Sequence, residues 1–172
     1  IARQAFTKDE NRPDAVAKRR KTGQRTAREN ITDLCDPDSF TEFGSLVFAA
    51  RRQRNTIDDL IRTTPADGLV MGVGRINGDR VPDVDSRCVA MSYDYTVLAG
   101  TQGKKNHAKK DRMFHLAEKW RLPLVIFTEG GDFPHFGPFS AIADLSKRLF
   151  NADSELDEIL RSQTFSLLTM QV

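Results

Sequence analysis

The pattern that most restricts the fold of this chain is an apolar strand preceded by an amphipathic helix. Residues 124–128, Leu-Val-Ile-Phe-Thr, form an uncharged run, as expected for a strand buried on both faces of a parallel sheet. Residues 100–103 are small and lead into the helix, which Pro123 ends. A further strand is predicted before it, at 87–98. This order predicts a β-α-β unit with a right-handed crossover, within an α/β fold. The apolar face of the helix consists of Met113, Leu116, Ala117 and Trp120.

An Asn-Gly pair at 77–78 is the strongest hairpin signal in the chain. Both central residues of a type I′ turn need a positive φ, which asparagine and glycine tolerate best. The sequence therefore predicts a strand at 69–76, a tight turn at this pair, and a return strand that starts near Asp79. An irregular acidic segment through Asp85 is expected before the strand at 87–98.

The remaining segments divide the chain into an arm, a domain and a tail. Residues 1–25 are polar and charged, which predicts an arm that is helical or is ordered only against another surface. Residues 26–150 are expected to form the domain, and residues 151–172 a tail of uncertain structure. The other predicted elements are a helix at 26–34 that Thr26 or a neighbour caps, a turn at 36–39, a strand within 40–49, a loop and short helix at 51–62, a loop at 132–138, and helices at 139–150 and 154–160.

The overall composition is typical of a globular cytoplasmic protein. Hydrophobic residues make up 39% and charged residues 29% of the chain. No run of eighteen apolar residues exists, so we expect no membrane partner. Cys35 and Cys88 lie far apart and match no metal or redox spacing, which predicts two reduced thiols. No group of residues has the spacing of metal ligands, and no metal is expected.

Basic residues gather in two segments, although the net charge is only +2. Residues 18–28 contain six basic residues and no acid, and residues 104–112 contain five basic residues and one acid, Asp111. Such clusters indicate an anionic partner, either phosphate groups on a small ligand or nucleic acid. The alternative is that each cluster is a solvated helix face. The clusters contain almost no aromatic residues, so nucleic acid is not the expected partner.

Two glycines, Gly130 and Gly131, follow the apolar strand directly. A glycine pair lets two backbone N–H groups approach a carbonyl oxygen and stabilise the charge that develops on it in a transition state. Each such donor is typically worth about 3–4 kcal/mol. The alternative is a tight turn that needs a positive φ. Ligands of open α/β sheets bind beyond the carboxyl ends of strands, where this pair and residues 100–103 are both predicted.

The second candidate site is the start of the predicted helix. Gly100, Thr101, Gln102 and Gly103 are followed by Lys104 and, nearby, His107. Free N–H groups at a helix start, together with lysines, favour an anion. An ordinary helix start with exposed lysines is the alternative, and the sequence lacks the pattern of a Walker A loop. No partner carboxylate or serine for His107 can be named, so no catalytic triad is predicted.

Five stretches together resemble the carboxyltransferase subunits of acetyl-CoA and propionyl-CoA carboxylases. Their order and spacing over residues 12–131 make the resemblance specific. They are Gly-Gln-Arg-Thr-Ala-Arg-Glu-Asn at 23–30, Asp-Pro-Asp-Ser-Phe-Thr-Glu at 36–42, the strand pair around 77–78, Tyr-Asp-Tyr-Thr-Val-Leu-Ala-Gly-Thr-Gln-Gly at 93–103, and Thr-Glu-Gly-Gly at 128–131.

The resemblance implies a crotonase-like fold, a spiral of stacked ββα units, of which this chain holds the amino-terminal part. It implies transfer of a carboxyl group from carboxybiotin to the α-carbon of an acyl-CoA, acetyl-CoA or propionyl-CoA. Gly130 and Gly131 would hold the thioester oxygen, and no side-chain nucleophile would be needed. The acyl-CoA would contact residues from two regions: Arg25, Arg28, Gly100, Thr101, Gln102, Gly103, Lys104 and His107.

The same resemblance implies partners. These are a biotin carboxyl carrier protein, a biotin carboxylase, and the carboxyl-terminal carboxyltransferase domain of another chain in a homo-oligomer. Residues 132–134, Asp-Phe-Pro, depart from the family pattern of a longer glycine run followed by an arginine. Residues 132–172 show no clear match. Two alternatives therefore stay open: the reverse reaction, a decarboxylase, and a non-catalytic domain that binds acyl-CoA or scaffolds a larger carboxylase.

Overall fold

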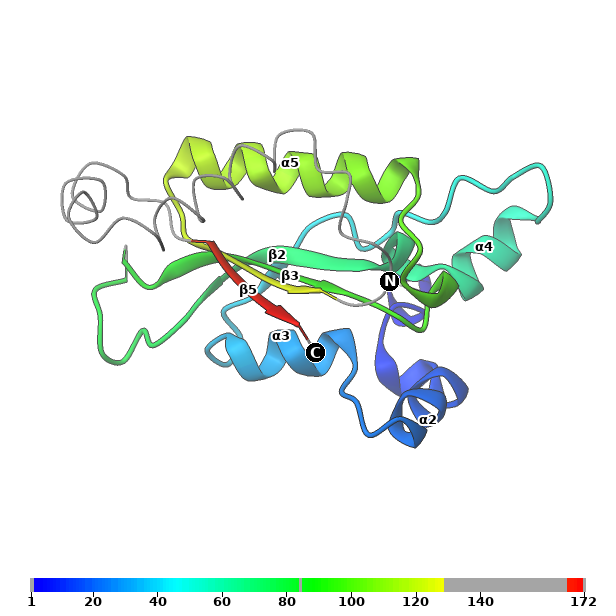
Figure 1. Ribbon diagram of the computed structural model, residues 1–172, viewed down its shortest axis with the longest axis horizontal. Coiled ribbons are helices and arrows are strands. Elements are labelled where there is room, and N and C mark those ends of the chain that lie inside the picture. The colour runs from blue at the N-terminus through cyan, green and yellow to red at the C-terminus, as the bar shows by residue number, and fades with distance from the viewer. Residues whose placement is uncertain (1, 84, 129–166, 172) are drawn as a thin grey trace.

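The computed structural model describes residues 2–83, 85–128 and 167–171, which form a mixed α/β fold in three layers. A twisted five-stranded sheet lies between α5 (Lys104–Trp120) on one face and α3 (Ala27–Leu34) on the other (Figure 1). The strands are β1 (Thr41–Glu42), β2 (Leu69–Arg75), β3 (Arg87–Tyr93), β4 (Leu124–Thr128) and β5 (Leu167–Gln171). The other helices are α1 (Ala2–Ala5), α2 (Pro13–Lys21) and α4 (Ile57–Thr63), with 3₁₀ turns at Asp9–Asn11, Pro65–Gly68 and Leu98–Gly100.

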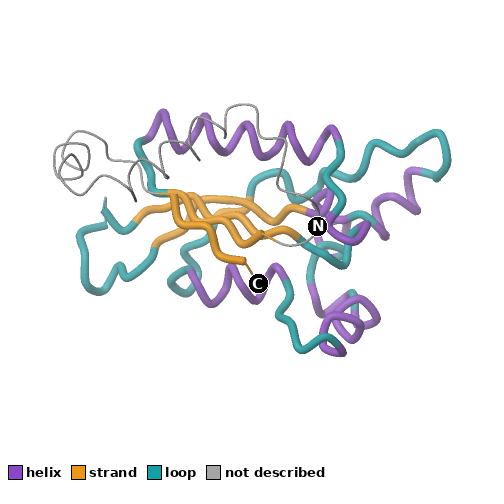
Figure 2. Tube along the Cα trace, viewed as in Figure 1, coloured by secondary structure: helices purple, strands orange, loops and turns teal. Residues whose placement is uncertain are grey.

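The strands follow the order β1-β2-β3-β4-β5 across the sheet. β1, β2 and β3 are antiparallel neighbours, whereas β3, β4 and β5 are parallel. α5 connects β3 to β4 and covers one face, as Figure 2 shows. The predicted β-α-β unit is thereby confirmed. Because Ser92 pairs with Phe127, the carboxyl ends of β3 and β4 lie next to each other.

The main core lies between the sheet and α5. Met91 and Leu124 on the sheet are fully buried against Met113 and Ala117 of the helix. Trp120, predicted to belong to this apolar face, is instead 51% exposed. The helix ends there with Arg121 in the left-handed region, φ 52°. The Leu122 N–H then donates to the Ala117 carbonyl and Leu122 takes the core position.

A second, smaller core lies between the sheet and α3. Ile31 packs with Val70 and Ala90 of the sheet, and Phe40 covers the edge of this cluster. Gly72 of β2 permits close packing at the edge of this cluster. A Cβ atom at Gly72 would lie 2.1 Å from the Thr41 carbonyl oxygen, so only glycine lets β1 and Phe40 approach this closely.

The prediction of a tight Asn-Gly turn is wrong. β2 and β3 do form an antiparallel pair, but residues 76–86 separate them in the sequence and no return strand starts at Asp79. The Ile76 N–H donates to the Ser86 carbonyl and ends the ladder. Asn77 has φ 55°, but the Gly78 N–H donates to the Asp36 carboxylate at 2.9 Å. That long-range bond competes with the local turn.

The strand predicted at 87–98 also ends earlier, at Tyr93. The Asp94 carboxylate accepts the Thr96 N–H at 3.0 Å, and the Val97 N–H donates to the Asp94 carbonyl. These bonds turn the chain away from the sheet. The helix at 26–34, the strands at 69–76 and 124–128 and the helix after 103 are confirmed within two residues. A two-residue strand, β1, lies within 40–49, as predicted.

Several predictions lie outside the described residues. They are the loop at 132–138 and the helices at 139–150 and 154–160. The boundaries of arm, domain and tail stay predictions, as does the crotonase-like spiral of which this sheet would be one part. In the part of the chain that the structure describes, no helix has the length and apolar character that crossing a membrane requires.

Candidate functional site

The candidate site is the loop at 94–103, which connects the carboxyl end of β3 to the first turn of α5. β4 ends beside β3 at the same edge of the sheet, and ligands of open α/β sheets bind at such an edge. The chain continues from β4 into Glu129, Gly130 and Gly131, the predicted oxyanion-hole segment. These three residues lie outside the described residues.

The middle of this loop adopts a strained backbone. Leu98 and Ala99 both have φ 52°, and Gly100 has φ 74°. A residue other than glycine costs about 1–2 kcal/mol in the left-handed region. Such a conformation persists only where the surroundings hold it. The loop is held from within, because the Gly100 N–H donates to the Val97 carbonyl at 3.1 Å.

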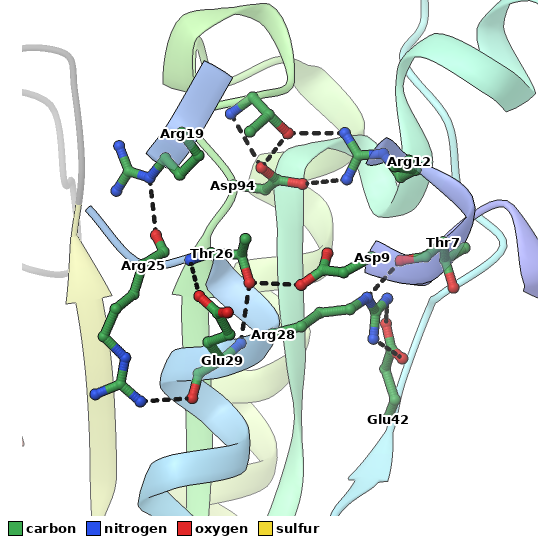
Figure 3. Close-up of polar contacts among 11 residues, drawn as sticks. Thr7, Asp9, Arg12, Arg19, Arg25, Thr26, Arg28, Glu29, Glu42 and Asp94 are labelled. Atoms are coloured by element: carbon green, nitrogen blue, oxygen red, sulfur yellow. Dashed lines mark hydrogen bonds and ion pairs between the residues drawn. The ribbon is translucent and has the colours of Figure 1, made fainter. Parts of the chain in front are cut away.

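An arginine of the amino-terminal arm braces the same loop from outside (Figure 3). Arg12 donates from Nη1 to Asp94 Oδ2 at 2.8 Å and from Nη2 to Thr96 Oγ1 at 2.7 Å. The second carboxylate oxygen of Asp94 accepts from the Thr96 hydroxyl and from the Thr96 N–H. The Arg12 and Asp94 side chains are only 11% and 12% exposed. A charge-assisted bond in such a setting is stronger than one in open solvent.

A second set of contacts joins the arm to the start of α3 (Figure 3). Thr26 caps α3, since its hydroxyl accepts the Glu29 N–H and the Glu29 carboxylate accepts the Thr26 N–H. This reciprocal pair is a capping box. The Thr26 hydroxyl also donates to the Asp9 carboxylate, and Arg28 donates to the Thr7 carbonyl. The arm is therefore helical and packed against the domain.

Arg25 and Arg28, both predicted to contact acyl-CoA, lie at the start of α3 and have acidic partners. Arg28 makes a bidentate ion pair with Glu42, with both N–O distances 3.0 Å. Arg25 pairs with Asp33 at 2.9 Å in a solvent-exposed position. Both line a groove of about 1160 Å³ between the arm, α3 and residues 35–42. Their charges are thus largely satisfied within the protein.

The other predicted ligands lie together at the junction of the loop with α5. Gly100 is buried, Thr101 and Gly103 are exposed, and Lys104 starts the helix with its side chain in solvent. Gly103 provides no side-chain cap for α5. The predicted ligands Gln102 and His107 also lie here. The Lys110 Nζ is 3.4 Å from Gln102 Oε1 and 3.3 Å from His107 Nδ1.

Sequence reasoning missed the contact between α5 and the turn at Pro65–Gly68, which supports this junction. Lys109 is buried, and its Nζ donates to the Ala66 and Leu69 carbonyls. Burial lowers the pKa of Lys109 from its ordinary 10.5 to about 8. The Asp94 N–H donates to the Gly68 carbonyl, so the turn at Pro65–Gly68 also contacts the loop at 94–103. The sequence signal for the burial of Lys109 was its spacing of four residues from Met113, which places both side chains on the buried face of α5.

Two buried oxygen atoms beside the junction have no hydrogen-bond donor among the described residues. They are Asp67 Oδ2 and Asn106 Oδ1. The Asn106 amide donates to the Asp67 carbonyl at 2.8 Å. Burial raises the pKa of Asp67, against the attraction of nearby Lys109. No group of three or more histidine, cysteine, aspartate or glutamate side chains suited to a metal ion exists within residues 2–83, 85–128 and 167–171.

Comparison with known proteins gives consistent matches to one family. The family described as carboxyl transferase domain matches residues 18–136. The methylmalonyl-CoA carboxyltransferase 12S subunit of Propionibacterium freudenreichii subsp. shermanii is 34% identical over 117 residues, covering 67% of this chain and 20% of that protein. The propionyl-CoA carboxylase beta chain of Saccharopolyspora erythraea is 38% identical over 117 residues, covering 68% of this chain and 20% of that protein.

A solved structure is also similar. It is that of a single-chain, multi-domain long-chain acyl-CoA carboxylase, with a TM-score of 0.75 and 58% sequence identity. The match covers 80% of this chain and 14% of that one. This chain spans about a fifth of the length of the two curated relatives, 20% in each case.

Proposed function

Because the chain belongs to the carboxyl transferase domain family, we propose that it forms the acyl-CoA side of a carboxyltransferase site in a biotin-dependent acyl-CoA carboxylase. The proposed reaction moves a carboxyl group from carboxybiotin to the α-carbon of acetyl-CoA or propionyl-CoA. Carboxybiotin supplies the carboxyl group, and the resemblance puts its binding site on the carboxyl-terminal domain of another chain. The described residues are therefore assigned to the acyl-CoA alone.

The observation that supports this proposal best is the braced loop at 94–103. It holds Leu98 and Ala99 in the strained left-handed region, followed by Gly100 with φ 74°, at the carboxyl end of β3. Arg12 fixes the loop by binding Asp94. Ordering the arm for this contact costs conformational entropy, which a simple connection between a strand and a helix would not require. A strained, braced loop at the ligand-binding edge of a sheet is typical of a functional site.

The proposed roles of the loop and of α5 follow from where these residues lie, and the role of Gly130 and Gly131 follows from the family resemblance alone. The loop and the start of α5 would bind the CoA part of the substrate through Gly100, Thr101, Gln102, Gly103, Lys104 and His107. The backbone N–H groups of Gly130 and Gly131 would hold the thioester oxygen as its enolate forms, which lowers the barrier to loss of the α-proton. Arg25 and Arg28 would serve at most at the entrance, because each already has an acidic partner.

Assembly is part of the proposal. The partners would be a biotin carboxyl carrier protein, a biotin carboxylase and the carboxyl-terminal carboxyltransferase domain of a second chain, in a homo-oligomer. The chain itself covers 20% of each curated relative, so the complete site would include residues beyond it.

Calorimetry with propionyl-CoA and acetyl-CoA tests the binding step. The test variant is Gly100→Val, and Gly23→Val is the control for backbone strain, since the two glycines have φ 74° and 72° and valine strains both. The proposal predicts at least tenfold weaker acyl-CoA binding for Gly100→Val only. Equal affinity of both variants and the unmodified chain would contradict it.

The transfer step is tested in the complete protein that contains this chain. Incubation with a carboxybiotin donor should convert propionyl-CoA to methylmalonyl-CoA, or acetyl-CoA to malonyl-CoA. Binding without either product would favour the alternative, a domain that holds acyl-CoA without catalysis. Release of carbon dioxide from methylmalonyl-CoA as the only activity would favour the decarboxylase.

A further inference from the structure

Three cationic side chains from distant parts of the chain surround one aromatic ring beside the start of α5. Lys105 Nζ lies 4.3 Å from the centroid of the Phe48 ring. The guanidinium carbons of Arg3 and Arg52 each lie 5.8 Å from the same centroid. We refer to Arg3, Phe48, Arg52 and Lys105 as the Phe48 cluster. Each cation is attracted by the ring, but the three cations repel one another.

Backbone contacts hold two of these cations in place. Lys105 Nζ donates to the Phe48 carbonyl at 3.0 Å, and Arg3 Nη2 donates to the Leu46 carbonyl at 3.0 Å. Neither these residues nor Arg52 forms an ion pair with any of the described residues. By contrast, Arg12, Arg25 and Arg28 each face a carboxylate. The Phe48 cluster is therefore a concentration of positive charge that has no ion-paired acid in the described part of the chain.

The carboxylate that faces this region is buried Asp67. Burial raises the pKa of Asp67, and it outweighs the opposing effects of Lys109, of a hydrogen bond from the Asn106 backbone, and of Lys105 and Arg51. Asp67 forms no ion pair with the Phe48 cluster, and its Oδ2 atom is buried without a donor among the described residues. Arg51 and Lys104 are exposed and add further positive charge beside it. The local balance favours an anion with several negative oxygen atoms.

We propose that the Phe48 cluster binds the phosphate groups of the nucleotide part of acyl-CoA. This rests on the proposed function, and it assigns residues outside the loop at 94–103. Arginine presents a planar fork that fits phosphate oxygens in pairs, and lysine adds a point charge. Lys105 follows Gly103 by two positions, so the cluster adjoins the loop. The pantetheine arm separates the phosphates of CoA from the thioester. A protein that binds both ends therefore needs two neighbouring regions, such as the Phe48 cluster and the loop at 94–103.

The test compares ligands with and without phosphates on the full chain. Propionyl-CoA and propionyl-pantetheine are titrated by calorimetry into the unmodified chain, into the double variant R52Q/K105Q, and into the control R112Q/K119Q. The control removes the same charge from exposed positions on α5. We expect R52Q/K105Q to bind propionyl-CoA at least tenfold more weakly, since one charge-assisted contact is worth about tenfold in affinity. Binding of propionyl-pantetheine should not change, and the control should bind both ligands normally.

The outcomes separate this inference from the function on which it rests. If R52Q/K105Q binds propionyl-CoA as tightly as the unmodified chain, the phosphate site is refuted while the acyl-CoA proposal stands. If the unmodified chain binds neither ligand, both are refuted. Pyrophosphate is the probe for a different source of phosphate. Should it bind the unmodified chain as tightly as propionyl-CoA does, the cluster is a site for free phosphates and its assignment to CoA is overturned.

Discussion

Arg12 donates to Asp94 across 82 positions of sequence, with an Nη1–Oδ2 distance of 2.8 Å. This contact joins the amino-terminal helices to Asp94, the residue that follows β3 and begins the candidate loop. The second terminal nitrogen of Arg12, Nη2, donates to the Thr96 hydroxyl, and the Thr96 N–H donates to the Asp94 carboxylate. The arm and the loop therefore form one polar network, and a change in the arm should be felt at the loop.

Replacing Arg12 with glutamine should loosen this loop. The variant leaves the Asp94 carboxylate nearly buried without its cation, which should lower the free energy of unfolding by about 2 kcal/mol. Hydrogen exchange should be faster at the amides of residues 94–103. The control is Arg80→Gln, because Arg80 and Asp79 are 78% and 77% exposed and 3.7 Å apart; a pair so exposed contributes little. Unchanged exchange in the Arg12 variant would show that the brace is dispensable.

Replacing Gly72 with alanine should destabilise the fold severely. The new Cβ would lie 2.1 Å from the Thr41 carbonyl oxygen and 2.7 Å from the Phe40 ring, so the backbone of β1 would have to move. We expect a loss of about 3 kcal/mol or more in urea denaturation. The comparison is Gly103→Ala, where the nearest atom is Asp67 Oδ2 at 3.9 Å. That change should cost about 1 kcal/mol or less. Equal losses would mean that β1 and Phe40 do not pack as described.

The contact between Gly74 and Cys35 can be tested by a double-mutant cycle. Cys35 and Cys88 are both buried on the α3 face, and a Cβ added to Gly74 would lie 2.7 Å from Cys35 Sγ. Gly74→Ala alone should therefore cost about 2 kcal/mol. Cys35→Ala removes the sulfur, so the double variant should lose less than the sum of the single losses, with a coupling of about 1 kcal/mol or more. Strict additivity in thermal or urea unfolding would contradict this contact.

Lys109 should make stability depend on pH in a defined direction. Its pKa falls from 10.5 in the unfolded chain to about 8 in the fold, because burial disfavours the charged amine. Between these values the unfolded chain binds more protons, so this residue makes stability rise with pH. The unfolding free energy of the native chain minus that of Lys109→Met should increase between pH 7 and pH 10, by on the order of 2–3 kcal/mol. A difference that is flat or falls with pH would show that Lys109 is not buried as an ammonium.

Local patterns in the sequence predicted the elements whose signals are local. The period of α5, the apolar run of β4 and the Thr26 cap depend on neighbours within one or two turns. The hairpin prediction failed because Asp36, far away in sequence, binds the Gly78 N–H. The proximity of Cys35 and Cys88 was missed for the same reason, since only the pairing of α3 with β3 brings them together.

The candidate site was likewise predicted only where its signals are local in the sequence. The loop at 100–103 and Lys104 were predicted from small residues before a helix, and they do lie together. The brace from Arg12 and the contacts of Arg3 and Lys105 with Phe48 were not predictable, because each joins segments that are far apart in the sequence. The ion pairs of Arg25 and Arg28 were equally hidden, since a basic run gives no information on which acids fold against it.

The most direct test of the account is to map acyl-CoA binding residue by residue. The isotopically labelled chain is titrated with propionyl-CoA, and the backbone amide signals are followed by NMR. The account predicts saturable shifts at Gly100, Thr101 and Gly103, together with Lys105 at the Phe48 cluster, and no comparable shifts in α4. Saturable binding that leaves the signals of residues 98–105 unmoved would contradict the central claim that this loop holds the substrate.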